Sequence, residues 1–366
     1  MTALRHYKKT SRFFAVIVIL MSVLGYVVFL SAVLGRTSQD FSSFVFIAAK
    51  QLIILVLSLS VFWTISKLNF NFWRKYALVI FIIGVIVTLA VFIPGIGLES
   101  GGAKRWISFG NFSFQTSEIL KFGFVVYFAA WLAAFKEKAK TFKYGLLPFI
   151  ILAGISGGIL YLQPDTGTFV VIAATGMAMF IIAGGKWRHL AVIILLGIAF
   201  LSVATLTRPY IKDRIITYLN PQNDLLGASY QINQSLIAIG AGGVTGRGFG
   251  QSVQKFSFLP QPIGDSIFSV AAEEFGFIGA IVILLFFTLY GLIGLKIASS
   301  ASNTFGRLLA TGIVILVISQ SFINIGAMIG ILPLTGIPLV FFSQGGSALL
   351  FALLESGIVL NISRRI

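Results

Sequence analysis

The chain has 366 residues, of which 57% are apolar and only 10% are charged, and its mean hydropathy is +0.98. Because a soluble domain carries about 25% charged residues, this composition excludes the soluble, disordered and disulfide-scaffold classes and predicts a polytopic membrane protein. The net charge of +16 is attributed to cytoplasmic loops rather than to nucleic-acid binding. The absence of cysteine excludes thiolate metal sites and catalytic thiols.

Ten apolar runs are each long enough to cross a bilayer as a helix, which needs about 17–25 residues. They lie at about residues 13–34, 44–65, 77–94, 118–135, 144–162, 168–184, 190–206, 266–295, 307–330 and 346–362. The runs lack the two-residue alternation of transmembrane β-strands. The sequence therefore predicts an all-α polytopic membrane protein, with one membrane domain over residues 1–366 and a basic tail at 1–12.

The distribution of Lys and Arg predicts how these helices are oriented. With a cytoplasmic N-terminus, 17 of the 27 basic residues fall in inner segments and 8 in outer segments, while Lys50 and Lys121 lie inside spans. The positive-inside rule therefore places both termini in the cytoplasm. A large loop at 207–264, between the seventh and eighth helices, is then outside, and its residues 209–219 are expected to form an amphipathic segment on the membrane surface.

A glycine-rich stretch follows within this loop, with six glycines among residues 240–250. Backbone N–H groups in such a stretch can cradle a phosphate, although no Gly-Lys-Ser/Thr follows it and no strand precedes it, as a nucleotide-binding loop would require. A flexible turn is the alternative interpretation. Both interpretations remain open from the sequence.

Three ionisable residues are candidates for chemistry. Asp265 ends the large loop where the eighth span begins, so it either caps that helix or acts at the outer surface. Glu118 and Lys121 are three residues apart and therefore share one face of the fourth span. Intramembrane ionisable residues are functional candidates, and a structural ion pair is the alternative for these two.

Other acidic residues are expected to have structural roles. For Glu273, Glu274 and Glu355, which lie within predicted spans, structural pairing is the preferred interpretation. Asp165, in Gln163-Pro-Asp-Thr-Gly167, fits a tight turn or the N-cap of the next span.

The chain resembles the SEDS family (shape, elongation, division and sporulation), the membrane polymerases of peptidoglycan. Diagnostic segments include Gln163-Pro-Asp-Thr-Gly167 and Asp265-Ser-Ile-Phe268. The matching segments, in chain order, are 102–107, 115–118 with Lys121, 163–167, 229–235, 238–243, 246–250, 254–255, 259–260, 265–268, 273–276, 324–326, 332–336 and 345–347.

The chain departs from the family pattern at a few positions. Thr116 and Val340 replace prolines, Ser266 replaces a phenylalanine and Gln344 replaces a tyrosine. None of these changes removes an ionisable group. The Asp265-Ser-Ile-Phe268 form resembles the division branch, FtsW, more than the elongation branch, RodA.

The resemblance implies a ten-helix fold and the transfer of a lipid-pyrophosphate-linked glycan to the 4-hydroxyl of lipid II. Asp265 corresponds to the family's catalytic aspartate and is the candidate ligand of a divalent cation, Mg²⁺ or Mn²⁺, the one cofactor considered. Glu118 is expected to orient Lys121. The candidate pyrophosphate clamp consists of Arg105, Lys121, Arg214 and Arg247.

The resemblance also implies the partners and the location. The expected partners are lipid II, a cognate class B penicillin-binding protein that crosslinks the strands, and other divisome proteins, without nucleic acid. The expected location is the bacterial cell membrane at the division septum.

Two other functions remain open from the sequence. A lipid II flippase would need a polar route through the membrane, which Lys50, Glu273, Glu274 and Glu355 could line. A non-catalytic scaffold for a transpeptidase would not need Asp265.

Overall fold

The computed structural model describes residues 2–37, 40–100, 103–110, 112–221, 224, 227 and 229–365. Gly102 of the first family segment and parts of the large loop, including residue 223, lie outside the described residues. The helices are α1 (Thr2–Arg36), α2 (Phe41–Ile65), α3 (Asn71–Lys75), α4 (Ala77–Ala90), α5 (Thr116–Phe135), η1 (Lys136–Lys140), η2 (Phe142–Leu146), α6 (Leu147–Leu162), α7 (Thr166–Ile182), α8 (Trp187–Thr207), α9 (Pro209–Leu219), α10 (Tyr230–Gly242), α11 (Ile267–Ser299), α12 (Thr304–Met328) and α13 (Gly346–Ser363). The strands are β1 (Gly97–Ser100), β2 (Ala103–Phe109) and β3 (Phe112–Gln115).

Each of the ten predicted runs is a helix. Within the described residues, α1, α2, α5, α6, α8, α11, α12 and α13 are long and apolar enough to cross a membrane, and α4 and α7 are apolar but shorter. The prediction of an all-helical polytopic membrane protein is confirmed. Helix α1 begins at residue 2, so it also includes most of the predicted basic tail.

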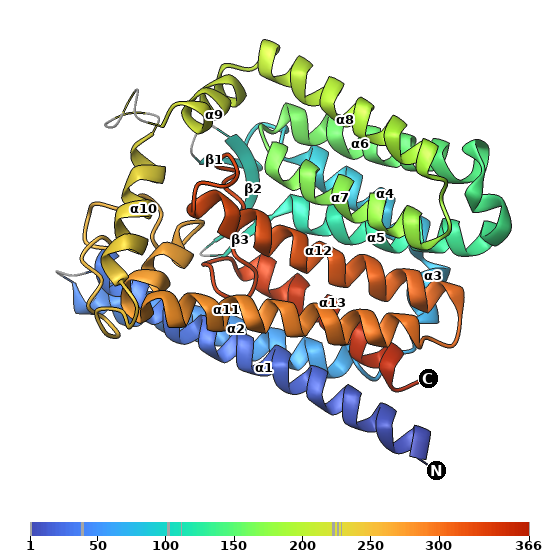
Figure 1. The fold of residues 1–366 in the computed structure, drawn as a ribbon, viewed down its shortest axis with the longest axis horizontal. Coiled ribbons are helices and arrows are strands. Elements are labelled where there is room, and N and C mark those ends of the chain that lie inside the picture. The colour runs from blue at the N-terminus through green and yellow to red at the C-terminus, as the bar shows by residue number, and fades with distance from the viewer. Residues whose placement is uncertain are drawn as a thin grey trace.

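The long helices lie side by side along the length of the molecule (Figure 1). Both termini lie at one end of the bundle, whereas β1–β3, α9 and α10 gather at the opposite end (Figure 1). The centre of the bundle is formed by α12 and α13, whose spans are 72% and 83% buried, while α8 at the edge is only 11% buried. The polar elements at the second end are therefore supported by a packed core.

A small antiparallel sheet, in the order β1–β2–β3, lies before α5. Gly97 pairs with Ile107, and Trp106 pairs with Gln115. The sequence did not predict this sheet, because strands of four, seven and four residues are too short to establish an alternating pattern. Strand β3 leads directly into α5, so the sheet adjoins the N-terminal end of the helix that carries Glu118 and Lys121.

The large loop contains two helices. Helix α9 coincides with the predicted amphipathic segment. Helix α10 was not predicted, and it packs against α11. Helix α11 is interrupted at Gly276, whose φ of 64° lies in the left-handed region that glycine adopts at low cost. The first turns of α11 are thus set apart from its membrane-spanning part.

Candidate active site

Asp265 lies just before α11 and does not cap it, because the N-cap residue is Ser266. The Gln231 side chain donates from Nε2 to Asp265 Oδ2 at 3.1 Å. The other oxygen, Oδ1, is buried and has no hydrogen-bond partner among the residues that the structure describes. Burial raises the pKa of the Asp265 carboxyl above its usual range, against the opposing effects of the Gln231 hydrogen bond and the Arg214 charge.

The backbone of Asp265 is held by α12. Asn324 Nδ2 donates to the carbonyl oxygens of Asp265 and Ile337, both at 2.8 Å. Gln231 Nε2 also lies 3.1 Å from Ser266 Oγ. No individual role was predicted for Gln231 or Asn324, although both lie in segments that match the family. The sequence signal that could have identified these two residues is a polar amide side chain within a largely apolar helix.

A pocket of about 430 Å³ lies between α9, α10 and the segment after α12. Gln231 contributes to the pocket wall and also holds Asp265. The lining includes polar Tyr210, Arg214 and Gln231 and apolar Ile232, Leu236 and Leu332. A wall of this mixed type suits a ligand with both charged and apolar parts.

Arg214 is the predicted clamp residue that interacts electrostatically with Asp265. Its guanidinium stacks 4.2 Å from the centre of the Tyr210 ring, a cation–π contact that orients it. Burial lowers the pKa of the Arg214 guanidinium from its ordinary value. The side chain also interacts with Asp165 and Arg105, so α9 brings its cation to a site with charges of both signs.

Arg105 of β2 is bound to the turn between α6 and α7. Its Nε donates to the Gln163 carbonyl at 3.2 Å, its Nη2 donates to the Pro164 carbonyl, and its Nη1 lies 3.8 Å from Asp165 Oδ1. Asp165 caps α7 through Thr168, which confirms the predicted cap. Arg105 therefore fastens the sheet to this turn.

Glu118 and Lys121 form the ion pair that their spacing predicted, at 2.9 Å. Lys121 Nζ also donates to Gln320 Oε1 of α12 at 2.6 Å. Glu118 and Lys121 are buried, and Glu355 of α13 interacts electrostatically with both. This buried polar cluster therefore joins α5, α12 and α13.

The glycine-rich stretch packs against the interruption in α11. The N–H groups of Arg247 and Gly248 donate to the carbonyls of Glu273 and Glu274, at 3.0 and 2.9 Å. A Cβ on Gly246 would meet Glu274 O at 2.1 Å. Because these two N–H groups are already bonded to the protein, they are not available to a phosphate, and Gly246 serves close backbone packing.

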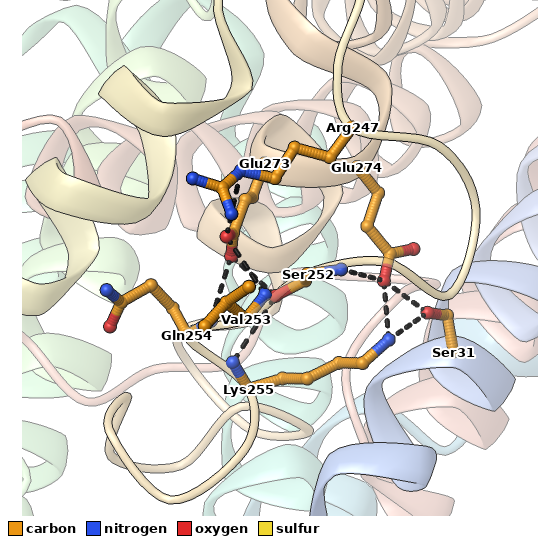
Figure 2. A network of polar contacts seen from close by, with 8 residues as sticks. All are labelled: Ser31, Arg247, Ser252, Val253, Gln254, Lys255, Glu273 and Glu274. Carbon is orange, nitrogen blue, oxygen red and sulfur yellow. Dashed lines mark hydrogen bonds and ion pairs between the residues drawn. The ribbon is translucent and has the colours of Figure 1, made fainter.

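Glu274 lies at the centre of a buried network (Figure 2). Its Oε1 is 2.7 Å from Lys255 Nζ and accepts from Ser31 Oγ of α1 at 2.5 Å. Lys255 Nζ also contacts Ser31 Oγ at 2.9 Å. The preferred interpretation of structural pairing is confirmed for Glu274.

Glu273 binds the backbone of the same loop (Figure 2). Its carboxylate accepts hydrogen bonds from Ser252 Oγ at 2.5 Å, Val253 N at 3.0 Å and Gln254 N at 3.2 Å. Arg247 Nε lies 3.6 Å from Glu273 Oε1 and 3.3 Å from the Ala241 carbonyl. Of the four predicted clamp residues, Arg214 and Arg105 thus share the electrostatic environment of Asp265 and Asp165, whereas Lys121 pairs with Glu118 and Arg247 with Glu273.

Asp265 is the residue that would hold a divalent cation. Among the described residues, no three His, Asp or Glu side chains lie close enough to hold a metal. Asp265 Oδ1 is nevertheless a buried oxygen that could ligate a metal, and it has no hydrogen-bond partner among the described residues. Because Mg²⁺ is commonly held by one or two carboxylates together with substrate phosphates and water, one carboxylate is a sufficient protein contribution.

Comparisons with known proteins identify relatives over nearly the whole chain. The chain is 36% identical over 98% of its length to stage V sporulation protein E of Bacillus subtilis, of which it covers 98%. It is 37% identical to the probable peptidoglycan glycosyltransferase FtsW of Geobacter metallireducens, over 95% of the chain and 94% of that protein.

Solved structures share the fold. One chain, from work on structural coordination of polymerization and crosslinking by a peptidoglycan synthase complex, is 28% identical, with a TM-score of 0.78 and 96% of both chains covered. Rod shape determining protein RodA of Thermus thermophilus, at 24% identity, has a TM-score of 0.70 over 96% of this chain and 95% of its own, a likeness of fold alone. The family model for FtsW, RodA and SpoVE, described as "Cell cycle protein", matches residues 11–366. The chain belongs to this family.

Proposed function

We propose that this chain is a peptidoglycan glycosyltransferase that polymerises lipid II on the outer face of the bacterial cell membrane. The observation that carries the proposal is the carboxylate of Asp265: its buried Oδ1 has no hydrogen-bond partner among the described residues, and its Oδ2 contacts Gln231, which lines a pocket of about 430 Å³. Relatives named probable peptidoglycan glycosyltransferase FtsW, at 36–37% identity, support the same activity.

Asp265 is assigned as the general base. The acceptor hydroxyl oxygen forms a bond to the anomeric carbon of the donor, its proton passes to Asp265 Oδ1, and the bond to the lipid pyrophosphate breaks. Gln231 donates to Oδ2 at 3.1 Å, so Oδ1 is the oxygen assigned to accept the proton. The raised pKa of Asp265 strengthens it as a base.

Arg214 is assigned to the leaving group. The departing pyrophosphate carries negative charge, and a guanidinium can pair with two phosphate oxygens at once. A divalent cation held by Asp265 would supply further positive charge to neutralise the pyrophosphate. Arg105, Lys121, Glu118 and Arg247 are proposed as supporting residues, because each is engaged by protein groups.

Purified protein in lipid vesicles, supplied with fluorescent lipid II, tests the proposal directly. Glycan strands resolved on a gel are the expected product. Translocation of lipid II without polymer would instead identify a flippase. That alternative is weakened because Glu273 and Glu274, two of its four candidate residues, are buried in contact with the loop backbone. A scaffold would give neither result.

Substitution of Arg214 by alanine is expected to slow polymerisation by about 10–100-fold, since a hydrogen bond to a charged group contributes roughly 1.5–3 kcal/mol. Lys212→Ala is the matched control, because Lys212 is a cation exposed on the same helix. The rate is measured with labelled lipid II. Equal effects of the two substitutions would contradict a specific role for Arg214.

Both termini are proposed to be cytoplasmic, on the basis of the 17-to-8 distribution of basic residues. In this cysteine-free chain, Lys138→Cys is expected to react with an impermeant maleimide only from the cytoplasmic side, and Asp224→Cys only from outside. Asp224 serves as the outer probe because residue 223 lies outside the described part. Labelling of Asp224→Cys from the inside would contradict the mechanism, because the polymer is made outside.

The partner is proposed to be a class B penicillin-binding protein within the division machinery at the septum. The relation to a chain of a peptidoglycan synthase complex supports this proposal. Lipid II is the proposed substrate, which the pocket's mixed polar and apolar lining suits.

A further inference from the structure

The segment at residues 244–258 exposes several apolar side chains. The exposed fractions are 65% for Val244, 51% for Phe249, 46% for Val253, 38% for Phe256 and 51% for Phe258. The segment lies between α10 and α11, outside any helix, and contains no acidic residue. Apolar side chains gathered in this way on one surface loop mark contact with a membrane or a partner.

Contacts with α1 fix the depth of this segment relative to the membrane. Lys255 Nζ lies 2.9 Å from Ser31 Oγ, a contact visible in Figure 2. The backbones also meet, because a Cβ on Gly35 would be 2.3 Å from Lys255 O. Ser31 precedes the last residue of α1, Arg36, by about 7.5 Å along the helix axis. The segment therefore lies beside the last turns of a membrane-spanning helix, where lipid headgroups meet acyl chains.

Much of the backbone of the segment is hydrogen-bonded by the protein at this depth. Glu273 accepts hydrogen bonds from the N–H groups of Val253 and Gln254, and Glu274 accepts one from Ser252 N. Irregular backbone at membrane depth is tolerated only where protein or water satisfies its polar groups. The two buried carboxylates supply acceptors that water would supply elsewhere.

We propose that residues 244–258 form a lipid-inserted loop, whose exposed apolar side chains contact the acyl chains of the leaflet into which α1 ends. The occupant of this surface is therefore lipid. Arg247, with a side chain 41% exposed, lies at the level of the lipid phosphates, where a basic residue is favoured. Glu273 and Glu274 make this insertion stable by bonding the loop backbone from the inside.

Fluorescent labelling tests the proposal without reference to activity. Phe256→Cys and Phe258→Cys are each labelled with an environment-sensitive dye in nanodiscs of phosphatidylglycerol and phosphatidylcholine, with Lys212→Cys as the exposed polar control on the same side. Emission at 256 and 258 is expected to be quenched by a lipid carrying a nitroxide near the headgroup end of its acyl chain, and to be shielded from iodide. Emission at 212 is expected to behave in the opposite way.

Strong iodide quenching at 256 and 258 in nanodiscs would overturn the proposal. Shielding that develops only after a partner protein is added would also overturn it and would identify a protein interface. Val253→Cys provides an independent probe if a phenylalanine substitution reduces the yield of folded protein, and each variant is first compared with the unsubstituted chain by thermal unfolding.

Discussion

Substitution of Asp265 by asparagine is expected to lower the rate of lipid II polymerisation by about 10²–10⁴-fold, the contribution typical of a general acid–base group. The asparagine side chain has nearly the same shape and can still accept the Gln231 hydrogen bond, but it cannot take up the acceptor's proton. The initial rate in vesicles, normalised to the amount of inserted protein, measures this loss. Thermal unfolding should change little, because neither the size nor the Gln231 contact is altered.

Asp40→Asn is the matched control. Asp40 caps α2 by accepting a hydrogen bond from Ser42 N at 3.0 Å, and asparagine caps helices about as well as aspartate. Its polymerisation rate should equal that of the unsubstituted chain. A near-normal rate for Asp265→Asn would reject the base assignment and restore the flippase and scaffold hypotheses.

Substitution of Lys255 by methionine is expected to destabilise the fold by about 3–5 kcal/mol, the cost of leaving one member of a buried ion pair without its partner. Lys255 and Glu274 are both fully buried and lie 2.7 Å apart. Removal of the ammonium leaves the Glu274 carboxylate without its neutralising charge. Thermal and denaturant unfolding in detergent micelles measure the loss.

The pair of Lys140 and Glu137 provides a control at the same distance, 2.7 Å, but with side chains 48% and 87% exposed. Lys140→Met should cost less than about 1 kcal/mol, because exposed pairs contribute little. Combining Lys255→Met with Glu274→Gln should recover part of the lost stability. Equal losses at Lys255 and Lys140 would show that burial of the first pair has no energetic consequence.

The helical fold could be predicted because each membrane-spanning helix is an apolar run that is visible in its own segment of the sequence. All ten apolar runs are helices. Helix α4 ends at Ala90, before the end of its predicted run, and α7 begins at Thr166, before the start of its run. Helix α10 was missed because its glycines and polar residues lower its helical signal. The interruption at Gly276 resembles an ordinary glycine within an apolar helix, so it has no distinct signal in the sequence.

The site could be predicted residue by residue, but its grouping could not. Asp265 meets Gln231 and Asn324 from 34 and 59 residues away along the chain, and spacing indicates nothing about contacts at such separations. Glu118 and Lys121 were paired correctly because a helix determines which residues share a face. Arg247 was assigned to the pyrophosphate clamp only because it is positively charged, whereas in the structure it forms an ion pair with Glu273.

The amide of Asn324 is a mechanical connection between two distant segments. One nitrogen holds both the peptide carbonyl of Asp265 and that of Ile337, which lies in the stretch between α12 and α13. A force on that stretch, from a neighbouring protein or from lateral pressure in the bilayer, is therefore transmitted through two hydrogen bonds to the peptide unit of Asp265.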